Sequence, residues 1–469
     1  MAAREPACRL QRYCIYLFIF GLYALSVRSG FAQMRRGPKL NLPDSPVVHG
    51  VEKPRSPAAA LPATSANLTA PSVQQITGDV YEYNYILPTG TGPYHTIGVH
   101  RIVRVQNGRP LVRHNAVFLA HGSEGSFDTD FMNSAEPSHS IAVYLASNGI
   151  DVWGIDYGWA LVPLSETDFT FMQNWGLQRD VDDLEAAILL ARIIRAATGS
   201  DGGRFPLLGF SSSGGTGFAL LNQEAKRPCR TRQVRAFIPM DLAFLTNDPS
   251  FQSAVCASEA IFRGYWGQGF YDDDSGSYFE IIGNLAQTDP NGLSPVFPPY
   301  TNLQSSLVLG AAPWLLGLVI PPSAHYVSGV FGPGGINSIP VGLQYTRVST
   351  WNKGLASTTP YQPILEEAEL EGVTCGDANP NYSDSLRLVK APVFYVGAAG
   401  AEGNLGLYTL TQLGSQDIQH YVVSFYPPDQ AELDFGHFDL MSADNAQDVV
   451  WSRILQWLQD HTDDNSCSE

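Results

Sequence analysis

The sequence predicts an α/β domain in which a mostly parallel sheet carries helices on both faces and is interrupted by one large insertion. Three observations support this fold class. Between residues 116 and 240, short apolar runs alternate with amphipathic segments, which is typical of parallel strands joined by helical crossovers. After Leu242 this alternation stops, and it returns only at Pro392. With 44% hydrophobic and 11% aromatic residues, the chain also has enough apolar side chains for a large core.

The predicted core opens with a hairpin. Residues 80–86 and 96–103 read as strands and flank a turn that is rich in glycine and proline. Apolar residues at three- and four-residue spacing predict a helix over residues 178–197, which ends before Gly199. The other elements expected up to residue 240 are strands at 116–120, 150–155, 206–208 and 236–240 and helices at 141–146 and 214–222.

The insertion covers residues 243–388, between the sixth and seventh predicted strands, and we interpret it as a cap. Residues 290–346 within it contain no Asp, Glu, Lys or Arg. Such a segment is consistent with a lid that faces an apolar substrate, with a self-buried helical subdomain or with a dimer face. The core is therefore expected in two parts, 78–242 and 389–469. The second part would hold strands at 392–396 and 421–425 and a final helix at 443–459.

The N-terminus has the order of a secretory signal. Two arginines precede an apolar run at residues 13–27, and the small residues Gly30 and Ala32 follow. This run is shorter than the roughly 20 residues that a membrane-spanning helix needs. We predict a signal peptide over residues 1–32 and a secreted or periplasmic location; an uncleaved membrane anchor is the alternative. Residues 33–77, rich in Pro, Ala and Ser, predict a flexible tether.

Four cysteines remain after removal of the predicted signal: Cys229, Cys256, Cys375 and Cys467. An even number of cysteines in an exported chain predicts two disulfides, and the sequence does not choose among the three pairings. There is no Cys-x-x-Cys motif, so no structural zinc site is indicated.

The net charge excludes one class of partner. The chain has 28 Lys and Arg against 45 Asp and Glu, which gives a net charge of −17. Nucleic-acid binding depends largely on basic residues that neutralise phosphates. We therefore expect no nucleic-acid partner.

A serine-rich turn carries the strongest chemical signal. Residues 207–215 read Leu-Leu-Gly-Phe-Ser-Ser-Ser-Gly-Gly and stand at a predicted strand-to-helix junction. A reactive serine on so tight a turn needs small residues two positions to either side, because the strand and helix backbones nearly touch. Ser211 has Gly209 before it and the small Ser213 after it, so we favour Ser211 as the nucleophile. Ser213 is the alternative, but it would place Gly209 and Phe210 in the strand.

Together with the elements around it, this turn resembles the α/β-hydrolase superfamily, especially its lipase and esterase branches. The resemblance covers most of residues 79–461. It rests on the order of a hairpin, a strand that ends in His121-Gly122, a helix, the run Gly-Ile-Asp-Val-Trp-Gly-Ile-Asp-Tyr-Gly at residues 149–158, and the serine turn. It implies the α/β-hydrolase fold, with the cap between strands six and seven.

The resemblance also implies an oxyanion hole. In these enzymes the turn after the third strand supplies one backbone donor, which here would be the N–H of Gly122 or Ser123. The residue after the nucleophile supplies the other donor, which here would be the N–H of Ser212. Ser213 departs from the family pattern, in which a glycine usually stands at that position.

A histidine and two candidate acids complete the site. His437 lies after the last predicted strand and before the C-terminal helix, where hydrolases of this fold carry the catalytic base. Asp241 directly follows the sixth strand, a position that some lipases of this fold use for the acid. Glu402 lies beyond the seventh strand, where most members keep it, but two residues past the usual place at Gly400. Because the acid must hold the imidazole rigidly, we favour Asp241, with Glu402 as the alternative.

These residues predict an exported serine hydrolase that cleaves carboxylic esters with an apolar moiety, on a hydrophobic small molecule or polymer. Ser211 would attack the carbonyl carbon, His437 would transfer the proton, and Asp241 would orient the imidazole. Lactones, amides and the C–C bonds of diketones are alternative substrates, and an inert binding protein of the same fold is an alternative of another class. No cofactor or metal is implied. The cap is a candidate for contact with a lipid interface.

Overall fold

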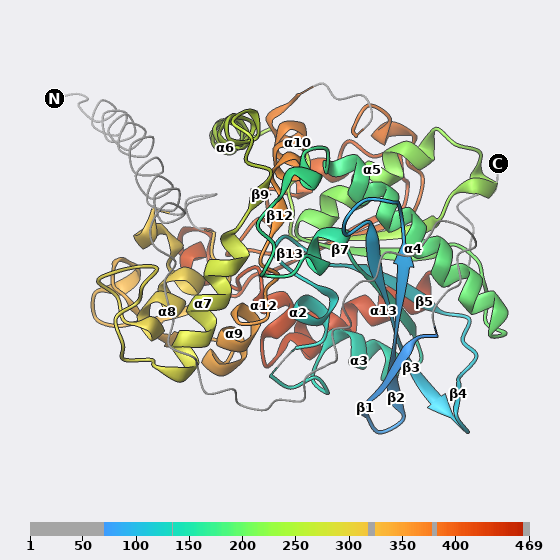
Figure 1. Ribbon diagram of the computed structural model, residues 1–469, viewed down its shortest axis with the longest axis horizontal. Coiled ribbons are helices and arrows are strands. Elements are labelled where there is room, and N and C mark those ends of the chain that lie inside the picture. Colours follow the sequence, from blue (N-terminus) through green and yellow to red (C-terminus); the bar gives the residue numbers. More distant parts are fainter. Residues whose placement is uncertain (1–69, 134, 318–323, 378–381, 463–469) are drawn as a thin grey trace. The chain divides into compact units, whose positions relative to one another are not determined.

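The computed structural model describes residues 70–133, 135–317, 324–377 and 382–462 (Figure 1). The predicted signal peptide and most of the predicted tether lie outside these residues, as does Cys467. Among the described helices, none is both long and apolar enough to cross a membrane.

A ten-stranded sheet forms the centre of the described domain (Figure 1). Its order is β1-β2-β3-β6-β5-β7-β8-β13-β14, and β4 also pairs with β3. The strands are β1 (Ser72–Thr77), β2 (Val80–Pro88), β3 (Thr96–Gln106), β4 (Arg109–Pro110), β5 (Ala116–Ala120), β6 (Asp151–Asp156), β7 (Phe205–Phe210), β8 (Val234–Met240), β13 (Val393–Ala398) and β14 (Ile418–Val423). The pairings from β6 to β14 are all parallel. The predicted fold class, a mostly parallel sheet with helices around it, is confirmed.

Strand β1 changes one predicted boundary. Residues 72–77 were expected to belong to the tether, but they pair antiparallel with β2 at the edge of the sheet. Four of the six residues are exposed, and the sequence Ser-Val-Gln-Gln-Ile-Thr offers little apolar alternation. This edge strand is held by backbone hydrogen bonds to β2 rather than by buried side chains. Its sequence therefore lacks the apolar alternation from which a strand is predicted.

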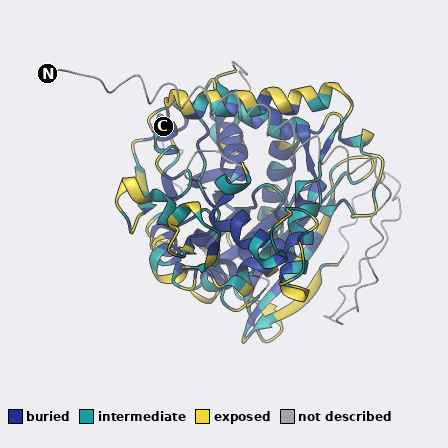
Figure 2. Ribbon diagram, turned by 90° about the vertical axis from the view of Figure 1, so that its left-hand side faces the viewer, coloured by how far each residue is buried: buried dark blue, intermediate teal, exposed yellow. Residues whose placement is uncertain are grey.

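Helices cover both faces of the sheet. The main ones are α3 (Ile141–Ser147), α4 (Leu177–Ala197), α5 (Ser212–Ala225) and α13 (Ser452–Asp460). In β5, Phe118 lies in a hydrophobic cluster with side chains of α4 and α5, whereas its neighbour Leu119 lies in a second cluster with α3 and α13. Both side chains are fully buried, as expected for a parallel strand that is covered on both faces. Figure 2 shows the buried residues gathered inside the fold and the exposed ones on its outer helices and hairpins.

The residues between β8 and β13 are largely helical. They form α6 (Pro249–Gly267), α7 (Ser275–Thr288), α8 (Asn302–Ala311), α9 (Val348–Leu355) and α10 (Ile364–Cys375), with the short strands β9 (Asp272–Asp273), β10 (Gly329–Phe331), β11 (Pro340–Leu343) and β12 (Gln362–Pro363). Leu309 of the uncharged segment packs with Ile282 and Trp351 in a separate small core. The uncharged segment 290–346 was interpreted as a lid, a self-buried helical subdomain or a dimer face. For α8, which lies in this segment, the packing of Leu309 fits the self-buried subdomain.

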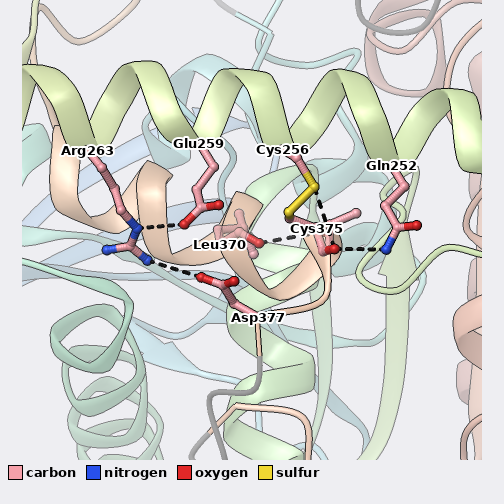
Figure 3. Close-up of a disulfide and its surroundings, with 8 residues drawn as sticks. Gln252, Cys256, Glu259, Arg263, Leu370, Cys375 and Asp377 are labelled. Atoms are coloured by element: carbon pink, nitrogen blue, oxygen red, sulfur yellow. Dashed lines mark hydrogen bonds and ion pairs between the residues drawn. A yellow bond between two sulfur atoms is a disulfide. The ribbon is translucent and has the colours of Figure 1, made fainter.

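A disulfide joins α6 to α10 through Cys256 and Cys375 (Figure 3). Next to it, Arg263 forms ion pairs with Glu259 and Asp377. The bond closes a loop of 119 residues, which removes many conformations from the unfolded chain. The prediction of two disulfides stays a prediction, because Cys467 lies outside the described residues.

Candidate active site

Ser211 occupies a strained turn between β7 and α5. Its φ of 54° and ψ of −129° lie in a region that residues with a Cβ rarely adopt. Its backbone N–H donates to Met240 O at 2.9 Å, and its carbonyl accepts from Gly214 N at 2.7 Å, so both sides of the turn are fixed. A Cβ at Gly209 would lie 2.3 Å from Ser213 O, which explains the small residue two positions before the serine.

The structure separates Ser211 from Ser213. Ser211 is partly exposed, whereas Ser213 is only 1% exposed. The Ser213 hydroxyl donates to His121 O at 2.5 Å and lies 2.9 Å from the hydroxyl of Tyr157. The serine that stands in place of the family glycine thus ties the turn to the end of β5. These contacts engage Ser213 and leave Ser211 as the serine that reaches the surface of the turn.

His437 and Asp241 lie in direct contact. His437 Nδ1 is 2.6 Å from Asp241 Oδ2, and the other oxygen, Oδ1, accepts from Ala398 N at 2.8 Å. Asp241 is 1% exposed, so this carboxylate is held on both sides. Phe210, the residue before Ser211, stacks on the imidazole with ring centroids 4.6 Å apart. The ring therefore lies beside the serine turn.

The neighbours of His437 set its protonation. Burial alone would lower the pKa of His437, but the hydrogen bond and negative charge of Asp241 raise it above the usual range. The charges of Glu402 and Asp130 act in the same direction. The imidazolium form of His437 is thus stabilised by surrounding carboxylates.

Glu402, the alternative acid, has a different partner. Its Oε2 accepts from Ala243 N at 3.1 Å, while the described partner of His437 Nδ1 is Asp241. Burial raises the pKa of Glu402 to about 7, and the nearby charge of Asp241 adds to this effect. The structure therefore brings Asp241, rather than Glu402, into hydrogen-bond contact with His437.

The loop after β5 discriminates between the two candidate oxyanion donors. Gly122 N donates to Asp130 Oδ2 at 2.8 Å, so this N–H already has a partner. A Cβ at Gly122 would lie 2.7 Å from Ser211 Cβ, which shows how closely the loop approaches the serine. Of the pair Gly122 and Ser123, Ser123 is thus the better candidate. Ser212, the other candidate, is the first residue of α5, where backbone N–H groups have no intrahelical acceptor.

Asp130 belongs to this site although no sequence motif indicates it. It lies in the short helix α2 (Phe127–Phe131) and is 4% exposed. Burial raises the pKa of Asp130 to about 7, although the hydrogen bond from Gly122 lowers it. Asp130 thus anchors the loop and also contributes to the charge around His437.

The loop that carries His437 rests on the cap. His437 N donates to His325 O at 3.1 Å, and Phe438 N donates to Tyr326 O at 2.6 Å. Asp439, which is buried, accepts from Ser328 N at 2.7 Å and thereby adds a side-chain link to the same cap segment. More than a hundred residues separate these partners, so no local motif could have revealed them.

Two groups of side chains among the described residues have the donor types and spacing of a metal site. The first is Glu82, His100 and Asp128; the ring nitrogens of His100 contact Glu82 of this group at 2.8 Å and Asp156, which lies outside it, at 2.9 Å. Burial alone would lower the pKa of His100, but these carboxylates raise it to about 10. The second group includes Cys375, whose sulfur is in the disulfide. The chemistry of the first group fits a buried ion pair better than a metal ligand set.

Comparison with solved structures supports the fold. A candidate lipase from Sulfolobus solfataricus is 18% identical to this chain, with a TM-score of 0.54, and the match covers 81% of this chain and 95% of that one. A soluble variant of monoglyceride lipase from Saccharomyces cerevisiae has 14% identity, 86% and 99% coverage and a TM-score of 0.42. An epoxide hydrolase from Vigna radiata has 12% identity, 81% and 98% coverage and a TM-score of 0.41.

Only the first of these three matches has a TM-score above 0.5, and identities this low speak for fold alone. No family model matches the sequence, and no curated protein matches it either. The chain has the α/β-hydrolase fold, and the predicted resemblance is confirmed at that level.

Proposed function

From the α/β-hydrolase fold and the geometry around Ser211, we propose that this protein is an exported serine hydrolase that cleaves carboxylic esters through an acyl-enzyme. The observation that carries the proposal is the 2.6 Å contact between His437 Nδ1 and Asp241 Oδ2, beside a serine held at positive φ. A Ser-His-acid arrangement needs this combination, because the carboxylate fixes the imidazole tautomer and leaves Nε2 to accept the serine proton.

The proposed reaction proceeds in two steps. Ser211 Oγ attacks the carbonyl carbon while His437 Nε2 takes its proton, and the N–H groups of Ser212 and Ser123 stabilise the oxyanion. His437 then gives the proton to the leaving alcohol, which departs and leaves an ester on Ser211. In the second step His437 takes a proton from water as the water oxygen attacks the acyl carbon, and it then returns that proton to Ser211 Oγ, which releases the carboxylic acid product and restores free Ser211.

The surroundings of His437 support an apolar substrate. Phe210 and Phe438 pack around the imidazole, and Tyr326 of the cap lies with its ring centroid 6.5 Å away. The cap also contains the uncharged segment 290–346. We include an apolar acyl or alcohol moiety and contact of the cap with a lipid interface in the proposal. Export through the N-terminal signal is part of it as well.

The test uses a fluorophosphonate probe and a series of short- and long-chain p-nitrophenyl esters. Ser211→Ala should lose labelling and reduce turnover by several orders of magnitude. Ser213→Ala is the matched control, since it removes a hydroxyl two residues away and should still label. Labelling of Ser211→Ala at the parent rate would reject Ser211 as the nucleophile. A parent protein that labels but hydrolyses only lactones, amides or diketones would redirect the substrate class, and one that does not label would favour an inert binding protein.

A further inference from the structure

Hydrogen bonds from the cap hold the loop that carries Ser123. Thr359 N donates to Glu124 O at 2.7 Å, and the Thr359 hydroxyl donates to Gly125 O at 3.2 Å. The Ser275 hydroxyl donates to Glu124 Oε1 at 2.6 Å. Because Thr359 and Ser275 belong to the cap, the loop is fixed by a part of the chain more than a hundred residues away.

One cap side chain, that of Gln362, contacts both Ser123 and Glu124. Gln362 is 1% exposed, and its backbone pairs with Asp273 of β9. Its Oε1 accepts from Glu124 N at 3.1 Å, and its Nε2 donates to Ser123 Oγ at 3.3 Å. Nε2 also donates to Glu366 Oε2 at 2.5 Å. Glu366 thus fixes which end of the amide faces Glu124.

The turn from Gly122 to Gly125 needs these contacts because its backbone conformation is strained. Gly125 N donates to Gly122 O at 3.2 Å, so Ser123 and Glu124 are the central residues of a four-residue turn. Glu124 has a φ of 49°, a value at which that position usually carries Gly or Asn. Strained backbone persists only where surrounding contacts hold it. Without the acceptor on Gln362, the Ser123–Glu124 peptide can rotate to the commoner turn, in which the φ of Glu124 is negative.

The N–H of Ser123 depends on two anchors. On one side Gly122 is held by Asp130, and on the other Gln362 holds both the Ser123 side chain and the Ser123–Glu124 peptide. We propose that Gln362 is a positioning residue for the oxyanion hole, which acts through the turn and never touches the substrate. This inference rests on the proposed function, in which Ser123 is an oxyanion donor. It makes the cap a part of the catalytic apparatus as well as a cover over it.

The test replaces the amide without changing the strand. Gln362→Leu keeps a similar volume and removes both hydrogen-bonding groups. We expect kcat to fall about 10- to 100-fold, less than the 10²–10³-fold loss that follows deletion of a whole oxyanion donor. KM should change less than about threefold, because the interaction is made in the transition state. The rate of fluorophosphonate labelling should fall in parallel with kcat.

Two further variants separate positioning from stability. Tyr361→Phe, at the neighbouring residue, removes a partly buried hydrogen bond to Leu164 O at 3.1 Å, and it should keep the parent kcat. In the exchanged pair Gln362→Glu/Glu366→Gln, the carboxylate introduced at position 362 accepts from Glu124 N. The amide introduced at position 366 donates to that carboxylate, so most of kcat should return. Glu366→Gln alone should lower kcat by a smaller factor, because it removes the acceptor that orients the Gln362 amide.

Each rate is divided by the fraction of molecules that the probe titrates at Ser211. The inference is overturned if Gln362→Leu then matches Tyr361→Phe, or if the exchanged pair is no better than Gln362→Leu. If Gln362→Leu does not fold, Glu366→Gln and the exchanged pair decide, and equal kcat in both overturns the inference. A parent protein that neither labels nor hydrolyses esters refutes the proposed function, and this inference with it. Parent activity with unaffected Gln362 and Glu366 variants refutes the inference alone.

Discussion

The core and the cap contribute to the candidate site in different ways. The core supplies Ser211, Asp241 and His437, which lie after β7, after β8 and in the loop beyond β14. The cap supplies contacts that hold the loops: Gln362 binds the Ser123 turn, and the backbone of His325 and Tyr326 binds the loop of His437. The side chains of the proposed triad thus come from strand ends, while the loops around them are also held by contacts with the insertion.

Among the described residues, buried charge is compensated by basic partners at one point of the core but not at the contact between cap and core loop. In the core, Asp151 is fully buried and pairs with both Arg101 and Arg195. At the contact between the cap and the Ser123 loop, the carboxyls of Glu124 and Glu366 lie near other carboxyls. Burial raises the pKa of Glu124 and of Glu366 to about 7, and the charges of neighbouring carboxylates add to this effect. Buried charges of one sign favour the protonated forms.

The largest expected effect tests the core half of the comparison. Asp241→Asn should lower turnover by roughly 10³–10⁴-fold, because an amide does not hold the productive tautomer of His437. Glu402→Gln should lower it less than about tenfold, since Glu402 contacts Ala243 N instead. Steady-state kinetics on both variants, with melting temperatures to confirm folding, checks this. A normal rate in Asp241→Asn beside a crippled Glu402→Gln would transfer the role to Glu402.

This difference also explains what the sequence could predict. The positions of Ser211, Asp241 and His437 follow from local signals, namely a glycine-flanked serine, a strand end and a loop before a helix. Although 196 residues separate His437 from Asp241, the order of strands brings their loops to one edge of the sheet. The fold class could be predicted for the same reason, since strand and helix periodicities are local.

The remaining parts of the site depend on contacts that have no local pattern. The preference for Ser123 over Gly122 rests on the side chain of Asp130, which belongs to no sequence motif. The bond between Glu124 and Gln362 spans 238 residues, and nothing near either residue indicates the other. A single sequence reports how a segment folds locally, but it does not report which distant segment fixes a strained turn.

A second prediction concerns stability and the charge of the cap contact. Carboxyls with raised pKa in the folded state keep protons that the unfolded chain loses, so stability should fall as pH rises from about 4.5 to about 7. Below that window both states are protonated, and above it both are ionised and the loss is complete. The loss should be at most about 3 kcal/mol for one such carboxyl. Denaturant unfolding at pH 5 and pH 8 measures it.

A matched pair of variants sharpens this prediction. Burial raises the pKa of Glu367 well above its usual range, and among the described residues its Oε2 has no hydrogen-bond partner. Glu367→Gln should therefore stabilise the protein at pH 8. In the core, the carboxylate of Glu224 accepts from Gln233 N and Val234 N, so Glu224→Gln should not stabilise it. An equal gain in stability at pH 8 in both variants would show that the hydrogen bonds made by a buried carboxylate do not decide whether its replacement stabilises the protein.

The smallest expected effect concerns Asp130, which anchors the loop from the core side. Asp130→Asn keeps an oxygen that can accept from Gly122 N, so the kcat plateau should stay within about threefold of the parent, in contrast to Gln362→Leu. The variant removes a negative charge that raises the pKa of His437, so that pKa should fall and the neutral base should persist to lower pH. The acid limb of kcat/KM against pH should thus move to lower pH.

The size of this shift is limited because Asp130 is only one of three carboxylates that raise the pKa of His437. Asp241, which contacts the ring directly, and Glu402 both contribute more than Asp130 to the raised pKa of His437. We therefore expect a small shift, well below the several units that a full buried charge can cause. Profiles of kcat/KM between pH 5 and pH 8 for the parent, Asp130→Asn and Tyr361→Phe measure it. An acid limb that moves to higher pH would contradict the charge argument, and a collapsed plateau would show that the amide does not replace the carboxylate as an anchor.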